Sequence, residues 1–441
     1  MATITRRGVL TGGAGLAAAG ALGLGPLGRA ARAQELKFTP EAGAELRVLR
    51  WKRFVEGDET VFTANTARFT EITGVPVRVD NESWEDLRPK AAVAANVGKG
   101  PDIILGFNDD PHQFPDKLID VNDLADYLGA KYGGWYDVCR TYGTKGERWI
   151  ALPMGGPTSC TVYRRSWLAE AGFEALPGDN AGFLAACQAL AAKGHPPGFA
   201  FGHAVGDGNA VCQWLLWSHG GMIVDENDQV VLERPETLAA LEYAKELYAT
   251  LIPGTISWLD PHNNKAFLSE QIGLTFNGIS IYYAAKNSEE AKLKAIAEDI
   301  EHANLPVGPV GRPTQGALVT LAMIFSYSPY PNAAKEYLRF LMEKDQYDPW
   351  QQASIGYITQ PLAAYESNPV WTEDPKHTPF RDNLKRALWD GFAGSSGYAS
   401  AATAADFVLV DMFAEVVAGQ RTPKEAAQRA QRRAERYYRR T

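Results

Sequence analysis

The chain of 441 residues is poor in the residues that build metal and redox centres. It contains four cysteines and seven histidines. No two cysteines stand in a C-x-x-C pair and no H-E-x-x-H motif occurs, so a zinc site is not expected. Beyond residue 33 the chain also lacks the G-x-S-x-G turn of serine hydrolases and the glycine-rich loop of phosphate-binding enzymes. We therefore expect no cofactor and no bound metal.

The small number of cysteines leaves the question of disulfides open. An oxidising compartment would permit bonds among Cys139, Cys160, Cys187 and Cys212. Buried free thiols fit the sequence equally well, and the spacing of the four residues does not choose between these alternatives.

Long apolar runs and an excess of positive charge are missing as well. After residue 33 no segment reaches 18 consecutive apolar residues, so the sequence predicts no membrane-spanning helix there. The formal net charge is −8. Binding to a phosphate backbone needs a basic surface, so nucleic acid is not expected as a partner.

The first 33 residues have the order of an export signal. Arg6 and Arg7 precede an apolar, glycine-rich run over residues 9–27, and Ala31-Arg32-Ala33 provides the small residues that a signal peptidase recognises. The adjacent arginines favour the twin-arginine route, with an ordinary secretory signal as the alternative. Cleavage near Ala33 would place the mature protein in the periplasm. Its net charge would be −12, because the removed segment carries four arginines and no acidic residue.

The remaining residues, about 408, are too many for one hydrophobic core, so two domains are expected. Short apolar strands at 46–51, 75–79 and 102–105 alternate with helical segments at 59–73 and 84–97. This alternation is typical of βαβ units with right-handed crossovers. The sequence therefore predicts an α/β fold with a doubly wound parallel sheet, in which ligands bind beyond the carboxyl ends of the strands.

Several segments of the mature chain follow one another in an order typical of one family. They include the strand Gly100-Pro101-Asp102-Ile103-Ile104, Leu152-Pro153 before a glycine-rich turn, Val162-Tyr163-Arg164-Arg165, and Leu305-Pro306-Val307-Gly308-Pro309. Together these segments resemble the periplasmic solute-binding proteins of ABC importers, in the carbohydrate-binding group related to maltose-binding protein. The chain departs from this resemblance at Arg164, where many relatives have asparagine.

The resemblance implies a periplasmic binding protein-like fold with two discontinuous α/β lobes. Residues 34–154 with 275–326 would form the N-terminal lobe, and residues 155–274 with 327–441 the C-terminal lobe. Hinge segments would join the lobes and a ligand cleft would lie between them. The protein would bind a sugar or polyol as a monomer and deliver it unchanged to the ABC permease subunits in the inner membrane, so it would not be an enzyme.

Polar residues at the predicted strand ends are candidates for ligand binding. Asn81 follows the second strand, and Asn108, Asp109 and Asp110 follow the third. Sugar hydroxyls both donate and accept hydrogen bonds, and carboxylates and amides match them. We expect at least one side chain of 108–110 to reach the ligand. The alternative is that these residues cap the following turn or helix.

Aromatic rings are the second group of candidates, because flat rings cover the apolar faces of a sugar. Trp51 ends the first strand, Trp84 begins the following helix, and Trp214 lies on a later helix. Trp350 and Tyr357 have weaker support. Each of these rings could instead pack in a core.

Turn and amide residues complete the predicted site. Gly156 and Thr158 lie at a glycine-rich crossing between the lobes, and Asn209 precedes the helix that carries Trp214. Asn277 and Gly278 follow an apolar strand, where a glycine lets the backbone approach a ligand closely.

Three other functions stay open on the sequence. The adjacent carboxylates Asp109 and Asp110 suggest a secreted glycoside hydrolase as one alternative. Neighbouring residues on a strand point to opposite faces, however, so a catalytic pair would need a carboxylate from a distant segment. The adjacent tyrosines Tyr282 and Tyr283 suggest ferric iron as an alternative ligand. The acidic charge would attract a polyamine. The tryptophans favour a sugar over these alternatives.

Overall fold

Residues 36–439 are described by the structure, which is a computed structural model. The predicted export signal, residues 1–33, lies outside this range. Within it, every helix is too short or too polar to cross a membrane. The four cysteines are buried free thiols. Burial raises the pKa of each thiol, so all four stay protonated.

The first sheet is built on the βαβ units that the sequence predicts. Strand β1 (Leu46–Trp51) pairs in parallel with β2 (Val77–Glu82) on one side and with β3 (Ile103–Phe107) on the other. Strands β11 (Thr320–Ile324) and β6 (Leu152–Gly155) extend the sheet with antiparallel pairing. The order is β2-β1-β3-β11-β6, so the expected parallel sheet is in fact mixed.

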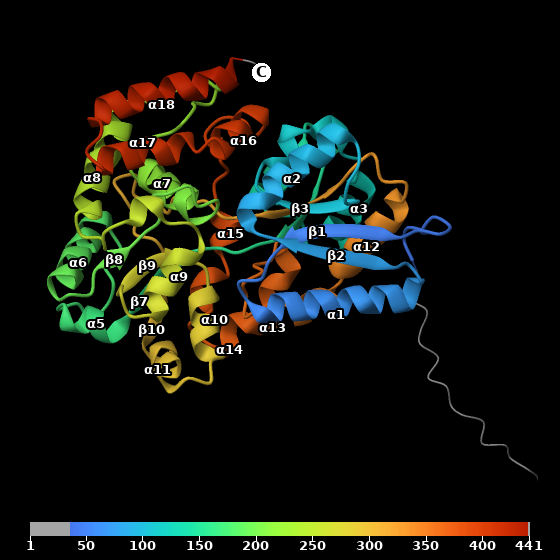
Figure 1. The fold of residues 1–441 in the computed structure, drawn as a ribbon, viewed down its shortest axis with the longest axis horizontal. Coiled ribbons are helices and arrows are strands. Elements are labelled where there is room, and N and C mark those ends of the chain that lie inside the picture. Colours follow the sequence, from blue (N-terminus) through green and yellow to red (C-terminus); the bar gives the residue numbers. More distant parts are fainter. Residues whose placement is uncertain (1–35, 440–441) are drawn as a thin grey trace, which may run out of the picture. The chain divides into compact units, whose positions relative to one another are not determined.

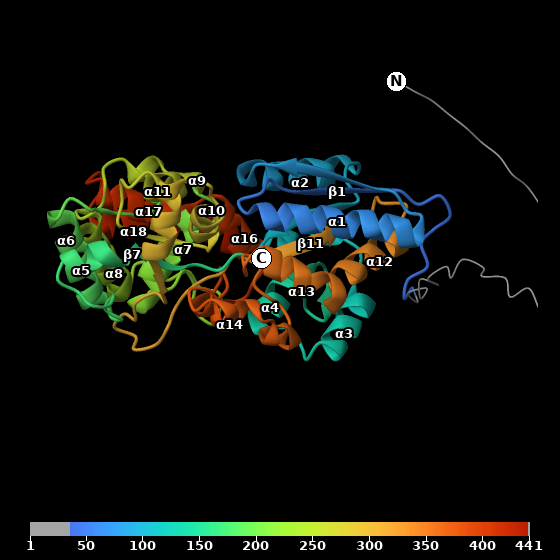
Figure 2. The same ribbon diagram turned by 90° about the horizontal axis from the view of Figure 1, so that it is seen from below.

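Helices cover both faces of this sheet. Helix α1 (Glu56–Thr73) connects β1 to β2, and α2 (Trp84–Val97) connects β2 to β3. The two crossovers run in opposite directions along the sheet, so right-handed connections place the two helices on opposite faces (Figure 1). Helices α12 (Pro331–Leu341) and α13 (Lys344–Ala353) pack beside α1 (Figure 2).

The second sheet has the order β10-β7-β9-β8. Strand β7 (Cys160–Arg164) pairs antiparallel with β10 (Ile300–Ala303) and β9 (Leu274–Asn277), and β8 (Pro197–Gly198) pairs in parallel with β9. Large apolar side chains, among them Phe183, Trp214, Leu241 and Phe413, form a separate buried cluster beside this sheet. Other residues of this sheet, Cys160 and Val162 of β7 and Ile300 of β10, belong to the buried cluster that also contains the first sheet, so hydrophobic packing is continuous between the two sheets.

The other helices and short strands complete the layers around the two sheets (Figure 1). Their bounds are α3 (Asn122–Lys131), α4 (Asp137–Gly143), β4 (Thr144–Lys145), β5 (Arg148–Trp149), α5 (Arg165–Glu170), α6 (Asn180–Ala192), α7 (Asp207–Ser218), α8 (Pro235–Tyr248), α9 (Pro261–Leu268), α10 (Ser280–Lys286), α11 (Ala291–Asp299), α14 (Val370–Glu373), α15 (Asn383–Arg386), α16 (Tyr398–Ala405), α17 (Val408–Val417) and α18 (Pro423–Tyr438).

Within the described range the chain passes between the two sheets at three crossings. The first crossing runs from β6 to β7 through residues 156–159, close to the predicted position. The second runs from β10 to β11 through residues 304–319. The third is the long segment of residues 354–397 between α13 and α16, which contains the short helices α14 and α15.

The crossings revise the predicted division into lobes. Residues 275–326 were assigned to the N-terminal lobe, yet β9 and β10 extend the second sheet. Residues 327–441 were assigned to the C-terminal lobe, yet α12 and α13 pack beside α1 on the first sheet. An apolar strand or an amphipathic helix fits either core, and only long-range pairing decides which one it joins.

A buried ion pair fastens α1 to the first sheet and to α13. Asp58 accepts hydrogen bonds from Arg50 Nη2 at 2.5 Å, from Trp51 Nε1 at 3.1 Å and from Trp350 Nε1 at 2.8 Å. The guanidinium carbon of Arg50 lies 4.4 Å from the Trp51 ring centroid and 4.2 Å from that of Phe62. Trp51 and Trp350 are therefore core residues, and we withdraw their predicted contact with a ligand.

We expect Asp58→Ala to lower the free energy of unfolding by about 3–5 kcal/mol, because the substitution leaves the Arg50 guanidinium buried without a counter-ion. Equilibrium urea denaturation measures the change. The control is Asp80→Ala, which removes a partly exposed carboxylate paired with Arg78. The control should cost less than about 1 kcal/mol. Equal losses in the two variants would contradict a special role for the buried pair.

Candidate functional site

A cavity that is partly open to solvent lies between elements of the two sheets, and its space, the open part included, is about 760 Å³. All three crossings contribute to its lining: Pro157 and Ser159 from the first, Leu318 from the second and Tyr357 from the third. The remaining lining comes from the end of β3 and the start of α2 on one side, and from α7 and the segment after β9 on the other. A molecule inside would therefore touch both parts of the chain at once.

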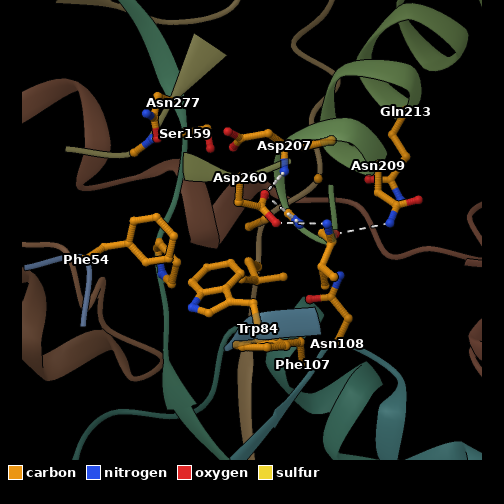
Figure 3. A pocket seen from close by; sticks show the side chains of 18 of the residues that line it. Phe54, Trp84, Phe107, Asn108, Ser159, Asp207, Asn209, Gln213, Asp260 and Asn277 are labelled. Atoms are coloured by element: carbon orange, nitrogen blue, oxygen red, sulfur yellow. Dashed lines mark hydrogen bonds between the residues drawn. The ribbon is translucent and has the colours of Figure 1, made fainter. Parts of the chain in front are cut away.

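Aromatic rings form one side of the cavity. The Trp84 ring lies 5.1 Å from the Phe54 ring, edge-on at 72°, and 4.8 Å from the Phe107 ring at 33°. Figure 3 shows these three rings grouped together, with Asp207 and Asp260 across from them. Such rings present flat apolar area at little cost in conformational entropy.

At another side of the cavity, the side-chain amides of two residues donate hydrogen bonds to the same carboxylate. Asn108 follows β3 in the left-handed region, at φ 50°, and its Nδ2 lies 3.3 Å from each carboxylate oxygen of Asp390. Gln213 on α7 donates to Asp390 Oδ1 at 2.7 Å. The Asn108 side-chain oxygen accepts from the Val319 N–H at 2.9 Å. These bonds link the end of β3 to α7 through the second and third crossings.

Carboxylates gather at the start of α7. Asp260 accepts hydrogen bonds from the backbone N–H groups of Val205 at 2.9 Å, Gly206 at 3.1 Å and Asp207 at 2.8 Å. Asp207 Oδ2 accepts from Asn263 Nδ2 at 2.6 Å. Burial, followed by the charge of Asp260, raises the pKa of Asp207 well above its usual value. Burial also raises the pKa of Asp260, to about 6.

Further amide groups line the cavity near the first crossing and α7. Asn277 donates to Asn264 Oδ1 at 2.5 Å, and its own side-chain oxygen accepts from the Gly278 N–H at 2.6 Å. Asn209 donates to the Val205 carbonyl at 3.1 Å. These contacts fix the orientation of both side chains before any ligand binds, which lowers the entropic cost of binding.

The cavity brings together part of the predicted site. Its predicted lining residues are Trp84, Asn108, Asn209, Asn277, Gly278 and Tyr357. Lining residues that the sequence did not single out are Phe54, Arg88, Phe107, Asp207, Gln213, Asp260 and Asp390. Asp207 and Asp260 each lie at the start of a helix, and this position is the one feature of the sequence that could have marked them as candidates. Nothing local in the sequence marks Asp390.

Four other predicted residues hold the fold together outside the cavity. A side chain on Gly156 would place its Cβ 2.1 Å from the Leu318 carbonyl oxygen, so this residue is needed for close packing of the crossings. The Thr158 hydroxyl lies 3.2 Å from that of Thr359. Trp214 is buried and donates to the Pro306 carbonyl, and Asn81 faces a different hollow, between α1 and β2. We no longer assign these four to the site.

Asp109 and Asp110 also lie outside the cavity, in separate environments. Asp110 accepts from Arg88 Nε at 2.5 Å and from the Phe107 N–H at 2.9 Å. Asp109 is completely buried, and no described residue donates a hydrogen bond of ordinary geometry to its carboxylate. Burial and then the charge of Asp390 raise the pKa of Asp109 well above its usual value. Neither carboxylate lines the cavity, so this pair gives no support to a hydrolase.

The tyrosine pair that suggested iron has other partners. The Tyr282 hydroxyl donates to Asp374 Oδ2 at 2.6 Å, and the Tyr283 hydroxyl accepts from the Gly57 N–H at 2.9 Å. Within residues 36–439 no group of three or more histidine, cysteine, aspartate or glutamate side chains is placed to hold a metal ion. The tyrosine pair therefore gives no support to iron binding.

Asp109→Asn should raise the free energy of unfolding at pH 8 by about 1–3 kcal/mol, because the amide removes a completely buried negative charge that lies near the charge of Asp390. The folded-state pKa of Asp109 is raised, so the stability tied to its protonated form is lost as the pH rises above 3.8. The gain should therefore be larger at pH 8 than at pH 5. Thermal denaturation at both pH values measures it.

The neighbouring substitution Asp110→Asn is the matched control for this measurement. It breaks the ion pair with Arg88 and should lower stability at both pH values. A loss of stability in Asp109→Asn that matches the loss in Asp110→Asn would contradict the distinction between the two carboxylates.

Comparison with known proteins agrees with this architecture. T. maritima MalE3 with bound maltose has a TM-score of 0.76 at 18% identity, covering 89% of this chain and 99% of that one. A sugar transporter protein of Arthrobacter chlorophenolicus with bound laminaribiose gives 0.75 at 17% identity, over 89% and 99% of the two chains. A solute-binding protein of Agrobacterium radiobacter with ribitol gives 0.74 at 18% identity, over 89% and 98%. At these identities the likeness establishes the fold.

Sequence comparison identifies the family. A probable ABC transporter-binding protein of Deinococcus radiodurans is 25% identical over 205 residues, which are 45% of this chain and 48% of that protein. The chain thus matches about half the length of this curated relative. Residues 64–379 match the family described as bacterial extracellular solute-binding protein. Because this match covers most of the chain, the protein belongs to the bacterial extracellular solute-binding protein family.

Proposed function

We propose that this protein is the substrate-binding component of an ABC importer and that it binds a sugar or polyol in the cavity. The observation that carries the proposal is the composition of the lining. Aromatic rings around Trp84 stand opposite amides and carboxylates that are already oriented by hydrogen bonds. Flat rings match the apolar faces of a sugar, and the polar groups match its hydroxyls.

The relatives support the same class of ligand. Proteins of this fold have been crystallised with maltose, tagatose, ribitol and mannitol. The curated relative is described as an ABC transporter-binding protein, which supports a role in transport. In this proposal the solute passes to the permease subunits of the inner membrane with no bond broken, and the binding protein acts as a periplasmic monomer after removal of residues 1–33.

The two sheets and their helices act as two lobes in this proposal. The cavity lining comes from both sheets, so a ligand makes its full set of contacts only when the lobes are together. Binding then favours that arrangement through its differential affinity for the two states. The three crossings between the sheets are the hinge segments.

A thermal-shift screen of the mature protein against monosaccharides, oligosaccharides and polyols tests the proposal. A ligand that binds the folded state alone raises the melting temperature by mass action. Asn209→Ala should weaken binding of the best ligand by about tenfold or more, since one oriented amide is lost from the cavity. Isothermal titration measures this change.

Asn332→Ala is the control for the same titration. It removes an exposed amide on α12, a helix that contributes no residue to the lining, and should leave affinity unchanged. The function proposed here fails if no sugar or polyol raises the melting temperature. The location of the site fails if both variants bind as the unchanged protein does.

A further inference from the structure

The lining of the cavity contains more acidic than basic side chains. Three lining residues are acidic, Asp207, Asp260 and Asp390, and one is basic, Arg88. Arg88 already forms an ion pair with Asp110, which lies outside the cavity, and its Nε donates to that carboxylate at 2.5 Å. Asp390 accepts hydrogen bonds from two neutral amides. The carboxyl groups of the cavity thus outnumber its cations, and neither Asp207 nor Asp260 is paired with the one cation, Arg88.

Asp260 contributes charge to the cavity and has little capacity left for a ligand. Its two carboxylate oxygens accept three hydrogen bonds from the backbone N–H groups of residues 205–207 at the start of α7. These donors orient the carboxylate and leave it close to Asp207. Neither of these two carboxylates forms an ion pair with any described lysine, arginine or histidine.

Asp207 is the carboxylate with a free oxygen. Its Oδ2 accepts from Asn263 Nδ2, while none of the described residues donates a hydrogen bond to Oδ1. The residue is 9% exposed and belongs to the cavity lining. Figure 3 shows its carboxylate directed away from α7, toward Ser159 and Asn277. An acceptor with one unused oxygen thus points into a cavity whose lining holds three acidic side chains.

A neutral hydroxyl could satisfy the hydrogen bond but would leave the charge unbalanced. Burying like charges together is costly, and a positively charged ligand removes that cost by forming an ion pair. Burial, followed by the charge of Asp260, raises the pKa of Asp207, so a cation that pairs with this carboxylate would displace its proton. The rings of Trp84, Phe54 and Tyr357 in the same lining suit a cation as well, since ring faces attract positive charge.

We propose that the ligand is an aminosugar, whose protonated amine donates to Asp207 Oδ1 while its ring lies against the aromatic side of the cavity. This inference rests on the function proposed above and narrows the class of sugar. Asp260 adds to the attraction through its charge. The amides of Asn209 and Asn277 remain available for hydroxyl groups.

Isothermal titration at pH 6.5 and low salt tests the inference with matched pairs that differ only in carrying amines in place of hydroxyls. The pairs are glucosamine and glucose, galactosamine and galactose, mannosamine and mannose, and the glucosamine dimer and cellobiose. We expect the amine of at least one pair to bind about tenfold more tightly than its neutral partner. Raising the salt concentration to 0.5 M should weaken binding of the amine more than that of the neutral sugar.

Asp207→Asn should remove the preference for the amine, measured as the ratio of the two affinities within each pair, because the amide accepts a hydrogen bond but carries no charge to pair with the ammonium group. The control is Asp116→Asn, which removes the same charge from an exposed side chain on the second short turn after β3. This control should keep the preference. If Asp207→Asn does not fold, the salt dependence of the unchanged protein decides.

The outcomes separate the two proposals. The aminosugar inference is overturned if the neutral sugars bind as tightly as the amines, if a preference survives in Asp207→Asn, or if the ligands found by the thermal-shift screen are all neutral. The proposed function itself is overturned if no carbohydrate, charged or neutral, binds at all.

Discussion

Three separate stretches of backbone pass through one crowded point, and the remaining architecture is arranged around it. Gly156 on the first crossing exchanges backbone hydrogen bonds with Thr359 on the third, at 3.1 and 3.0 Å. The Leu318 carbonyl of the second crossing lies so close to Gly156 that any side chain there would collide with it. Only glycine permits this approach. The crossings therefore stay together, and the cavity forms directly beside them.

The need to pair buried polar groups explains how the two sides of the cavity are connected. Asp390 is buried on the third crossing and accepts from Asn108 beyond β3 and from Gln213 on α7. Asp58 does the same between β1 and α13, where it balances the charge of Arg50. Unpaired charges in such places would be costly. Asp207 differs from Asp58, because no described lysine, arginine or histidine pairs with it, and that difference is the basis for expecting a cationic ligand.

The sequence predicted the local elements well where their patterns are short-range. The strand of residues 46–51 and the helix of residues 84–97 have the bounds expected of them, because apolar runs and amphipathic periods depend only on neighbouring residues. The prediction was incomplete for the first sheet, which contains two antiparallel strands, and the division into lobes had to be revised. Nothing in the local sequence of strand 274–277 indicates which of the two sheets the strand joins.

The order of family motifs was enough to predict the class of protein, and the βαβ alternation predicted the edge of the first sheet that lies beside the cavity. They also placed Trp84 and Asn108 correctly beside the cavity. Only the tertiary structure decided which of the other polar and aromatic residues face it. Asp390 and Asn108 are 282 residues apart, and their contact exists because the third crossing returns past β3. Trp51 is also an aromatic residue at the end of a strand, as a ligand-binding residue could be. Its ring nevertheless lies in the core, where it donates a hydrogen bond to Asp58.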